Sequence, residues 1–439
     1  MKQKKMLLIL LCVLIVLVLG ILFLLKEDKP NPTNLQNDAE TEERLVVFTA
    51  KQEDIQSVTY THPEEQFTLE LTDGIWLIKE QPKLPVSQPR ADGVAYDMAE
   101  FIAREVVEED AENIEKYGLL PAQITTTLTF KNGKEVPFYV GAKVQGEEQY
   151  YVKIGESNTV YAVDVSQCES ITYTMQDLMA MTMLELSQSE IASVEVTQKD
   201  GAHFCVTKSA EDGFEQWFFT EPFSWGVDET VIEQKLLTFL YRIDAFSYVT
   251  DKSDAELGLA NPQATVKAKL TDGTERTVQV GNVDAETGNV AVKVDGISYP
   301  GIVDLQIIQL TKLTKFDIID KTVEIADYND IDKVELEGEA EATLVYSDPC
   351  SLNGKSASKE TAIKLYSDIC ELKIDAENGS VSGAPVMTVT HTYKNGNTKS
   401  YKIYQQDAFN YVVTADDKAY FVIFRDAFMA WKKQIEAYL

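Results

Sequence analysis

The side chains that could carry out chemistry are few in this sequence. It has three histidines, His62, His203 and His391, among 439 residues. His203 and Cys205 alternate along one predicted strand, so they point to the same face. A cysteine with a histidine base is a nucleophilic pair, but no orienting acid or oxyanion loop is recognisable beside it. A hydrolase or thiol enzyme is therefore the last of three hypotheses for function.

The histidines do not predict a metal site. They fall in three different units of the chain, and a shared metal would require those units to converge. We expect ordinary surface or edge-strand histidines, and we predict no metal, no cofactor and no enzymatic activity. Outside the apolar N-terminal segment there are four cysteines, and either a Cys350–Cys370 disulfide or isolated buried thiols fit their spacing.

Two short stretches resemble ligand loops but fail in detail. Asn353–Ser356 ends like a phosphate-binding loop, yet its first glycine position is Pro349. The acidic run that begins at Asp327 resembles a calcium loop, but Asp332 stands where a glycine is required and Gly338 where a glutamate is required. The acidic groups at 108–110 and 147–148 are expected to be solvated turn residues. None of these stretches predicts a catalytic or cation site.

The charge balance excludes one class of partner. The chain has 40 Lys+Arg against 71 Asp+Glu, a formal net charge of −31. Such a surface repels phosphate backbones, so we expect no nucleic-acid partner. The composition, 44% hydrophobic and 10% aromatic, is ample for packed cores, and the length suggests about three domains.

The N-terminal segment predicts a membrane anchor. Residues 6–25 are uncharged and nearly all strongly apolar, long enough to span a bilayer as a helix. Lys2, Lys4 and Lys5 precede them, so the positive-inside rule keeps the N-terminus in the cytoplasm. Residues 1–26 are then a cytoplasmic tip and a transmembrane signal anchor, and 27–44 are a flexible polar stalk. We expect a single-pass protein of the bacterial cell envelope whose bulk is extracytoplasmic.

The remaining chain repeats itself. Similar strands begin at Ile55, Ile191 and Ile331, which are separated by 136 and 140 residues. We predict repeat unit 1 at 45–186, repeat unit 2 at 187–326 and a divergent repeat unit 3 with a C-terminal helix at 327–439. The fold class is α+β, with each unit a mostly antiparallel sheet of five or six strands packed with one helix. The terminal helix is expected to cover the last sheet, and docking of a partner is the alternative.

Turn residues and helical spacing set the elements of each unit. Asp-Gly between alternating strands predicts a hairpin with positive φ at both turn positions. The predicted hairpin turns are Asp73, Gly74, Asn132, Gly133, Asp212, Gly213, Asp272, Gly273, Asn395 and Gly396. In unit 1, Val94, Met98, Phe101 and Ile102 have the spacing of one helical face.

A glycine and proline stretch follows the helix in every unit. It reads E-K-Y-G-L-L-P at 115–121 and E-L-G-L-A-N-P at 256–262. We interpret it as a structural joint formed by Gly118, Leu119, Pro121, Gly258, Leu259 and Pro262. The glycines would take positive φ, the prolines would force an extended backbone before the next strand, and the leucines would pack the joint onto the core.

These motifs together resemble a known family. D-G-I-W-L-I-K-E-Q-P at 73–82, the Tyr-Gly-Leu-x-x-Pro joint and the Asn-Gly hairpin are similar to the family catalogued as domain of unknown function 4340. Members resemble extracytoplasmic companions of ABC exporters related to the gliding-motility type. The resemblance implies possible partners, the permease and ATPase subunits of a transporter, and supplies no catalytic residues.

The first hypothesis is accordingly a non-catalytic, membrane-anchored extracytoplasmic accessory or binding protein working with such a transporter. A cell-envelope structural spacer or adhesin is the second, and an envelope hydrolase or thiol enzyme is the third. The sequence leaves the ligand and the oligomeric state open.

Overall fold

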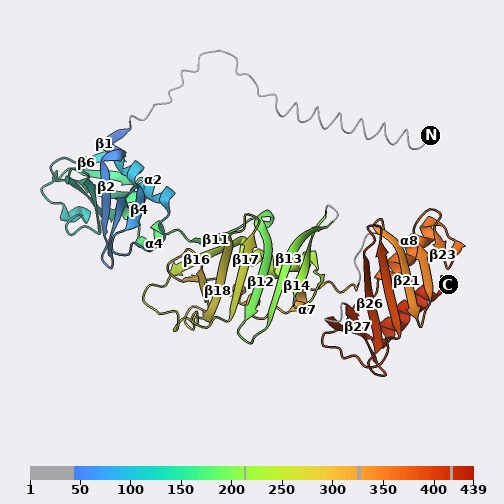
Figure 1. Cartoon of the computed structure of the whole chain (residues 1–439). Coiled ribbons are helices and arrows are strands. Elements are labelled where there is room, and N and C mark those ends of the chain that lie inside the picture. The colour runs from blue at the N-terminus through green and yellow to red at the C-terminus, as the bar shows by residue number, and fades with distance from the viewer. Residues whose placement is uncertain (1–43, 212–213, 324–327, 416–418) are drawn as a thin grey trace, which may run out of the picture.

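The computed structural model of the chain describes residues 44–211, 214–323, 328–415 and 419–439. The predicted anchor at 6–25 and nearly all of the predicted stalk lie outside these residues. Across the described ranges, no helix is long and apolar enough to cross a membrane. The architecture is mostly antiparallel sheet with a few helices, an α+β arrangement with three large sheets following one another along the chain (Figure 1).

The first large sheet has the strand order β4-β3-β2-β7-β8-β9-β10-β6. Its strands are β2 (Ile55–Thr61), β3 (Gln66–Thr72), β4 (Ile75–Ile78), β6 (Glu105–Glu108), β7 (Ile124–Phe130), β8 (Glu135–Lys143), β9 (Gln149–Ile154) and β10 (Val160–Asp164). Beside it, β1 (Leu45–Thr49) and β5 (Glu100–Ala103) form a separate antiparallel pair. The helical elements are η1 (Gln52–Asp54), α2 (Gln88–Ala99), η2 (Glu115–Tyr117), α3 (Val165–Thr172) and α4 (Met175–Leu178).

The second sheet has the order β11-β16-β20-β19-β18-β17-β12-β13-β14-β15. Its strands are β11 (Thr182–Glu185), β12 (Ile191–Gln198), β13 (His203–Glu211), β14 (Phe214–Glu221), β15 (Trp225–Gly226), β16 (Arg242–Tyr248), β17 (Ala264–Leu270), β18 (Glu275–Val283), β19 (Val290–Val294) and β20 (Gly301–Val303). Its helical elements are η3 (Gln188–Glu190), α5 (Glu229–Ile232), the π-helix η4 (Glu233–Leu237), α6 (Thr238–Tyr241), η5 (Leu305–Thr311) and α7 (Lys315–Ile318).

The third sheet has the order β24-β23-β22-β21-β25-β26-β27-β28. Its strands are β21 (Ile331–Gly338), β22 (Ala342–Val345), β23 (Ser351–Leu352), β24 (Lys355–Ser356), β25 (Met387–Tyr393), β26 (Thr398–Gln405), β27 (Asn410–Ala415) and β28 (Ala419–Phe424). Its helices are α8 (Lys359–Cys370) and α9 (Arg425–Glu436). In all three sheets the first long strand pairs with the next strand on one side and with a later strand on the other: β2 with β3 and β7, β12 with β13 and β17, and β21 with β22 and β25.

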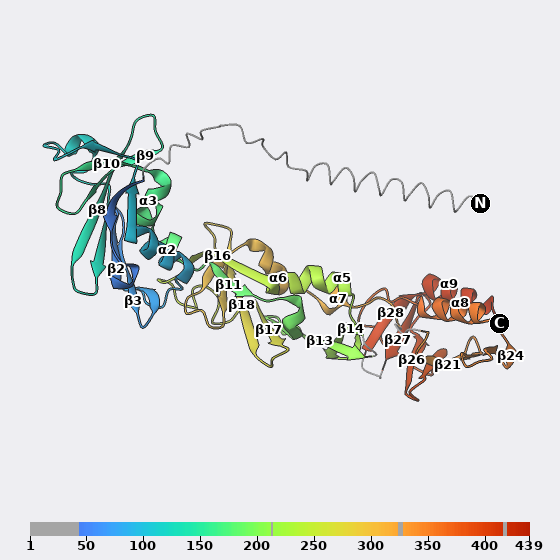
Figure 2. The same ribbon diagram turned by 90° about the horizontal axis from the view of Figure 1, so that it is seen from above.

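Alternation of residue type separates two faces in each sheet. In β17, Ala264, Val266 and Ala268 are fully buried, whereas Lys267 and Lys269, which alternate with them, are exposed. Successive side chains of a strand point to opposite faces, so the apolar set packs toward the helices and the polar set faces outward. Helices α5, α6, α8 and α9 lie on the same side of the second and third sheets (Figure 2).

An aromatic junction joins the second and third sheets. The ring of Phe421 on β28 meets Phe223 at 5.4 Å and Trp225 at 4.7 Å between ring centroids, both edge-on. Buried residues of both sheets form one continuous hydrophobic cluster through this contact. The Trp225 indole N–H also donates to the Asp320 carbonyl at 2.9 Å. Packing of this kind holds neighbouring sheets together through apolar burial and ring geometry.

Two details of the expected elements differ from the structure. Helix α2 ends at Ala99, so Phe101 and Ile102 lie in strand β5; Phe101 is still fully buried, but from a strand. The sheets also hold more strands than five or six, because short edge strands extend them. The terminal helix α9 covers the last sheet with Phe428, Trp431 and Ile435, whereas Phe424 and Leu439 at its two ends are about half exposed.

Candidate functional site

The outward face of the second sheet carries a cluster of polar side chains. Strand register places Glu195 of β12 opposite Cys205 of β13 on one side and Lys267 of β17 on the other. Cys205 in turn lies opposite Glu221 of β14. The inward neighbours of these residues, Val194, Phe204 and Val206 among them, fill the core. The alternation of β12, β13 and β17 therefore assembles this cluster on the face away from the helices.

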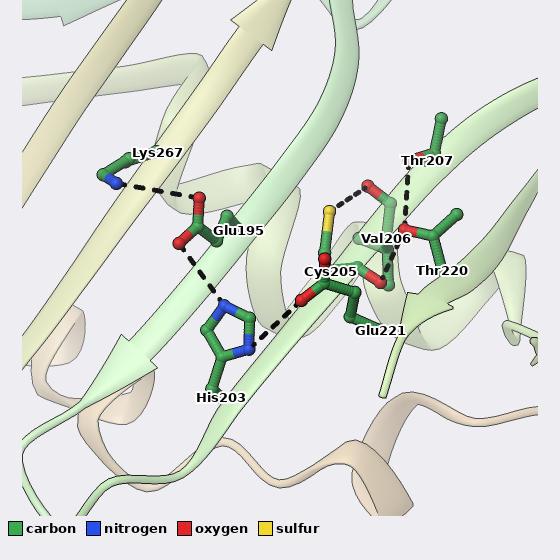
Figure 3. A network of polar contacts seen from close by, with 8 residues as sticks. All are labelled: Glu195, His203, Cys205, Val206, Thr207, Thr220, Glu221 and Lys267. Carbon is green, nitrogen blue, oxygen red and sulfur yellow. Dashed lines mark hydrogen bonds and ion pairs between the residues drawn. The ribbon is translucent and has the colours of Figure 1, made fainter. Parts of the chain in front are cut away.

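The imidazole of His203 lies between two carboxylates (Figure 3). Its Nε2 is 3.3 Å from Glu195 Oε1 and its Nδ1 is 3.7 Å from Glu221 Oε2. The other oxygen of Glu195 lies 3.7 Å from Lys267 Nζ. The Cys205 thiol turns instead to the Val206 carbonyl, with an S···O distance of 4.0 Å. His203 is thus paired with acids, and the described contacts do not join it to the thiol.

This arrangement supports recognition better than nucleophilic catalysis. The side chains of His203, Glu195 and Lys267 are between one third and one half exposed. Exposed ion pairs of this kind contribute about 0–1 kcal/mol to stability, because solvent screens them. A mixed set of charges on a flat sheet face can instead form hydrogen bonds and ion pairs with a partner. Among the described residues, no group of three or more His, Cys, Asp or Glu side chains could hold a metal ion.

The other two histidines lie in different sheets and environments. His62 Nε2 is 3.0 Å from the Tyr173 carbonyl in the first unit. His391 is fully buried on the inward face of β25, with Tyr366 and Tyr401 rings at 5.8 and 5.9 Å. The prediction of a surface or edge-strand histidine is wrong for His391. The sequence pattern indicates an inward position for His391, because Thr388, Thr390 and Thr392 alternate with it and take the outward positions.

The four described cysteines form no disulfide. Cys168 of α3 is fully buried, and burial raises the pKa of its thiol to about 12. A protonated thiol is a poor nucleophile and a poor metal ligand. Cys205, Cys350 and Cys370 are half-buried. The buried-thiol alternative describes Cys168 well.

The rejected loop motifs have ordinary structural roles where they are described. Asn353 and Gly354 take positive φ, 50° and 74°, in the tight turn between β23 and β24, which is not a phosphate loop. The Glu108 carboxylate accepts hydrogen bonds from Lys116 at 2.6 Å and Tyr117 at 2.5 Å, and these bonds lower its pKa. Glu148 pairs with Lys143 at 2.7 Å. The start of the acidic run, Asp327, lies outside the described residues.

The joint packs on the outward face of the first and second sheets. Gly118 and Gly258 have φ of 68° and 74°, and Pro121 and Pro262 stand shortly before β7 and β17. Leu119 is buried in a small cluster with Ala111 and Val160, and Leu259 in one with Leu257 and Ala291. These clusters are separate from the large core on the helical side. The joint leucines therefore cover the opposite face of the sheet from the one we expected.

Two further glycines, Gly141 and Gly281, accommodate the joint. A Cβ atom on Gly141 would lie 2.3 Å from the Tyr117 carbonyl oxygen, and one on Gly281 would lie 2.3 Å from the Leu257 carbonyl oxygen. Such distances are far inside van der Waals contact, so the joint backbone can approach only a glycine. The available signal was the Val-Gly dipeptide at 140–141 and again at 280–281, each in the strand that follows the Asn-Gly or Asp-Gly turn.

The predicted hairpin turns fall into two classes. Asp73 and Gly74 both have positive φ, 51° and 81°. In the other described turns the prediction of two positive φ values is wrong: only the glycine has one, with φ of 83° at Gly133, 88° at Gly273 and 85° at Gly396. There the preceding Asn132, Asp272 or Asn395 accepts a hydrogen bond from the backbone N–H two residues on, at 2.8–2.9 Å. That side-chain bond stabilises a type I turn followed by a left-handed glycine. Asp212 and Gly213 lie outside the described residues.

Comparisons with known proteins identify the family resemblance. Residues 76–254 match the model of the family described as Domain of unknown function (DUF4340), which confirms the similarity inferred from the motifs. The matched segment begins at Trp76 and ends at Asp254, shortly before the second joint. No curated protein matches the chain, and no solved structure matches it.

Proposed function

We propose that this chain is a non-catalytic, membrane-anchored extracytoplasmic accessory or binding protein that works with an ABC-type transporter of the gliding-motility-related kind. The proposal rests on the apolar segment at 6–25, the three lysines before it and the DUF4340 match. The observation that carries the binding role is the outward polar face shared by the second and third sheets. The Phe421 junction joins these sheets, and their helices lie on one side (Figure 2), so a partner would bind the opposite side where the joint does not cover it.

We further propose that the three sheets are three copies of one unit. Their strand orders support this, as do local features that recur at a fixed spacing. Trp76 N–H donates to the Gln88 side chain, and Trp217 N–H donates to the Glu229 side chain, in both cases twelve residues further on. Capping boxes formed by Thr174 with Asp177 and by Thr314 with Asp317 begin the short helices α4 and α7. Three copies of one unit would present three similar sheet surfaces, one after another along the chain.

The outward side chains determine what kind of partner fits. On β17 they include Lys267 and Lys269, and on β21 they include Lys333 and Glu335, which pair with each other at 2.8 Å. Threonines occupy the outward positions of β25. A surface of this composition is polar and mixed in charge, which suits a protein surface with complementary charges.

Chemical crosslinking in intact cells, followed by affinity capture of the tagged full chain, tests the proposal. We expect the permease or ATPase chains of an ABC transporter in the captured material. The double variant Lys267→Glu and Lys269→Glu should reduce that recovery, and Lys359→Glu on the exposed part of α8 serves as the matched control. Repeated recovery of no transporter chain would reject the proposal and favour a structural spacer or adhesin.

A further inference from the structure

A hollow of about 350 Å³ lies at the edge of the second sheet, between the helical segment and η5. Its base is formed by the buried residues Ile243, Val303 and Ile307. Phe239 of α6 lines it as well and is half-buried. Strand β16 brings Arg242 and Asp244 to the same place. The volume is at the small end of the range for ligand sites in proteins.

Three glutamine side chains surround this base. Gln234 comes from η4, and Gln306 and Gln309 come from η5; all three are exposed. Within the described ranges of the chain, the side-chain amides of these three residues make no hydrogen bond. An amide offers two donors and an acceptor at once, so three of them around one hollow provide many sites for a ligand rich in hydroxyl groups.

The helix beside the hollow has an unusual geometry. Residues Glu233–Leu237 form a π-helix between the two short α-helices α5 and α6. A π turn inserts an extra residue into the helix and is frequent at functional sites. Gln234 lies in this turn, and Thr238 and Phe239, which also line the hollow, follow it directly.

The charges of the hollow favour a neutral ligand. Its charged lining residues are Arg242, Asp244 and Asp304. The guanidinium of Arg242 is already engaged, with Nε donating to Asp244 at 2.6 Å and Nη2 donating to Thr182 at 3.0 Å. An anionic ligand would meet the two carboxylates without a free cation, and a cationic ligand would compete with Arg242 for Asp244.

We propose that this hollow binds a short neutral carbohydrate, with the amides of Gln234, Gln306 and Gln309 bonding its hydroxyl groups and Phe239 packing against the apolar face of a sugar ring. Aromatic rings supply apolar area with little loss of conformational entropy, and planar amides supply directional hydrogen bonds. The inference rests on the proposed binding role and assigns that role a ligand class.

Saturation-transfer difference NMR with the purified full chain tests this assignment. The probes are N-acetylglucosamine tetramer and maltotetraose, and the detergent is an amine oxide so that it contributes no sugar. We expect saturable binding of at least one neutral tetrasaccharide. The variant Gln306→Ala with Gln309→Ala should weaken that binding about fivefold or more, because two hydrogen bonds are lost. Gln279→Ala, on the outward face of β18, should bind as the unaltered chain does.

Three results would overturn the assignment. These are no binding of either tetrasaccharide, equal binding by the double variant, or stronger binding of tetragalacturonic acid or tetralysine. Equal thermal unfolding of both variants and the unaltered chain establishes that the fold is kept. If transporter chains are still captured while the sugars fail to bind, the ligand class is wrong and the proposed function stands. If sugars bind and no transporter is captured, the transporter partnership is wrong.

Discussion

The side chain of Gln88 completes the backbone hydrogen bonding of Trp76 at the edge of the first sheet. Gln88 Oε1 accepts from the Trp76 N–H at 2.9 Å, and Gln88 Nε2 donates to the Trp76 carbonyl at 2.9 Å. The amide thus takes the place of a neighbouring strand. An edge strand otherwise presents unpaired groups to which another chain can add.

Gln88→Ala removes both of these bonds at once. We expect the free energy of opening at the Trp76 amide, measured by hydrogen exchange, to fall by about 1–2 kcal/mol. Gln88→Glu is the control, because its carboxylate can still accept from the Trp76 N–H, as Glu229 accepts from the Trp217 N–H. Its free energy of opening should fall by about half as much as that of Gln88→Ala. An unchanged hydrogen-exchange rate of the Trp76 amide in Gln88→Ala would contradict the expectation, since water would then replace the Gln88 amide with no loss of free energy.

Gly141→Ala tests the close approach of the joint to β8. The added Cβ would lie 2.3 Å from the Tyr117 carbonyl oxygen, so the joint has to move, and we expect a loss of about 1–3 kcal/mol in the stability of the first unit. Gly93→Ala is the control, since its Cβ meets nothing within 4 Å in helix α2 and alanine is the better helix former. Urea unfolding followed by circular dichroism measures both, and equal midpoints for the two variants would contradict the expectation.

Phe421→Ala should loosen the junction of the second and third sheets. Phe421 is 2% exposed and packs against Phe223 and Trp225, and truncation of a buried phenylalanine costs about 3–5 kcal/mol. We expect a broader distance distribution in small-angle scattering and separate thermal transitions for the two sheets. Phe409→Ala is the control, because that ring is 76% exposed and should change neither measurement. A single unchanged transition in Phe421→Ala would refute the role of the junction.

Acid should weaken the pairing of β11 with β16. The hydrogen bond from Arg242 lowers the pKa of Asp244; partial burial opposes this, and the bond from Thr182 at 2.7 Å supports it. A lowered folded-state pKa means that the stabilisation is present above the unfolded pKa near 3.9 and is lost as the pH falls through the folded value. Protection of the β11 amides from exchange should therefore drop below about pH 4.

The variant Asp244→Asn should show weaker protection of β11 already at pH 6 and a flatter dependence on pH. Asp272→Asn is the matched control, since Asp272 also has a lowered pKa but bonds Thr274 within its own turn, away from β11. If protection of the β11 amides fell equally with pH in Asp244→Asn and in the unaltered chain, a group other than Asp244 would be responsible for the acid effect.

Local structure follows from short stretches of the sequence. Alternation in stretches such as β17 set which side chains face inward, and the Asp-Gly dipeptides marked turns with positive φ at the glycine, as at Gly74 and Gly273. These properties depend on neighbouring residues and on backbone sterics, so they are readable without the fold. The same reasoning, applied more strictly to the threonines around His391, would have placed that histidine inside.

Contacts between residues that are distant in the sequence depend on the folded chain. The pairing of β1 with β5 and of β11 with β16, the contact of Gly141 with the joint, and the packing of Phe421 on Trp225 all join segments far apart in the sequence. The hollow between η4 and η5 depends on such contacts as well. Register and packing across a sheet follow from the total burial of apolar surface and the pairing of backbone groups, which no short window of sequence contains.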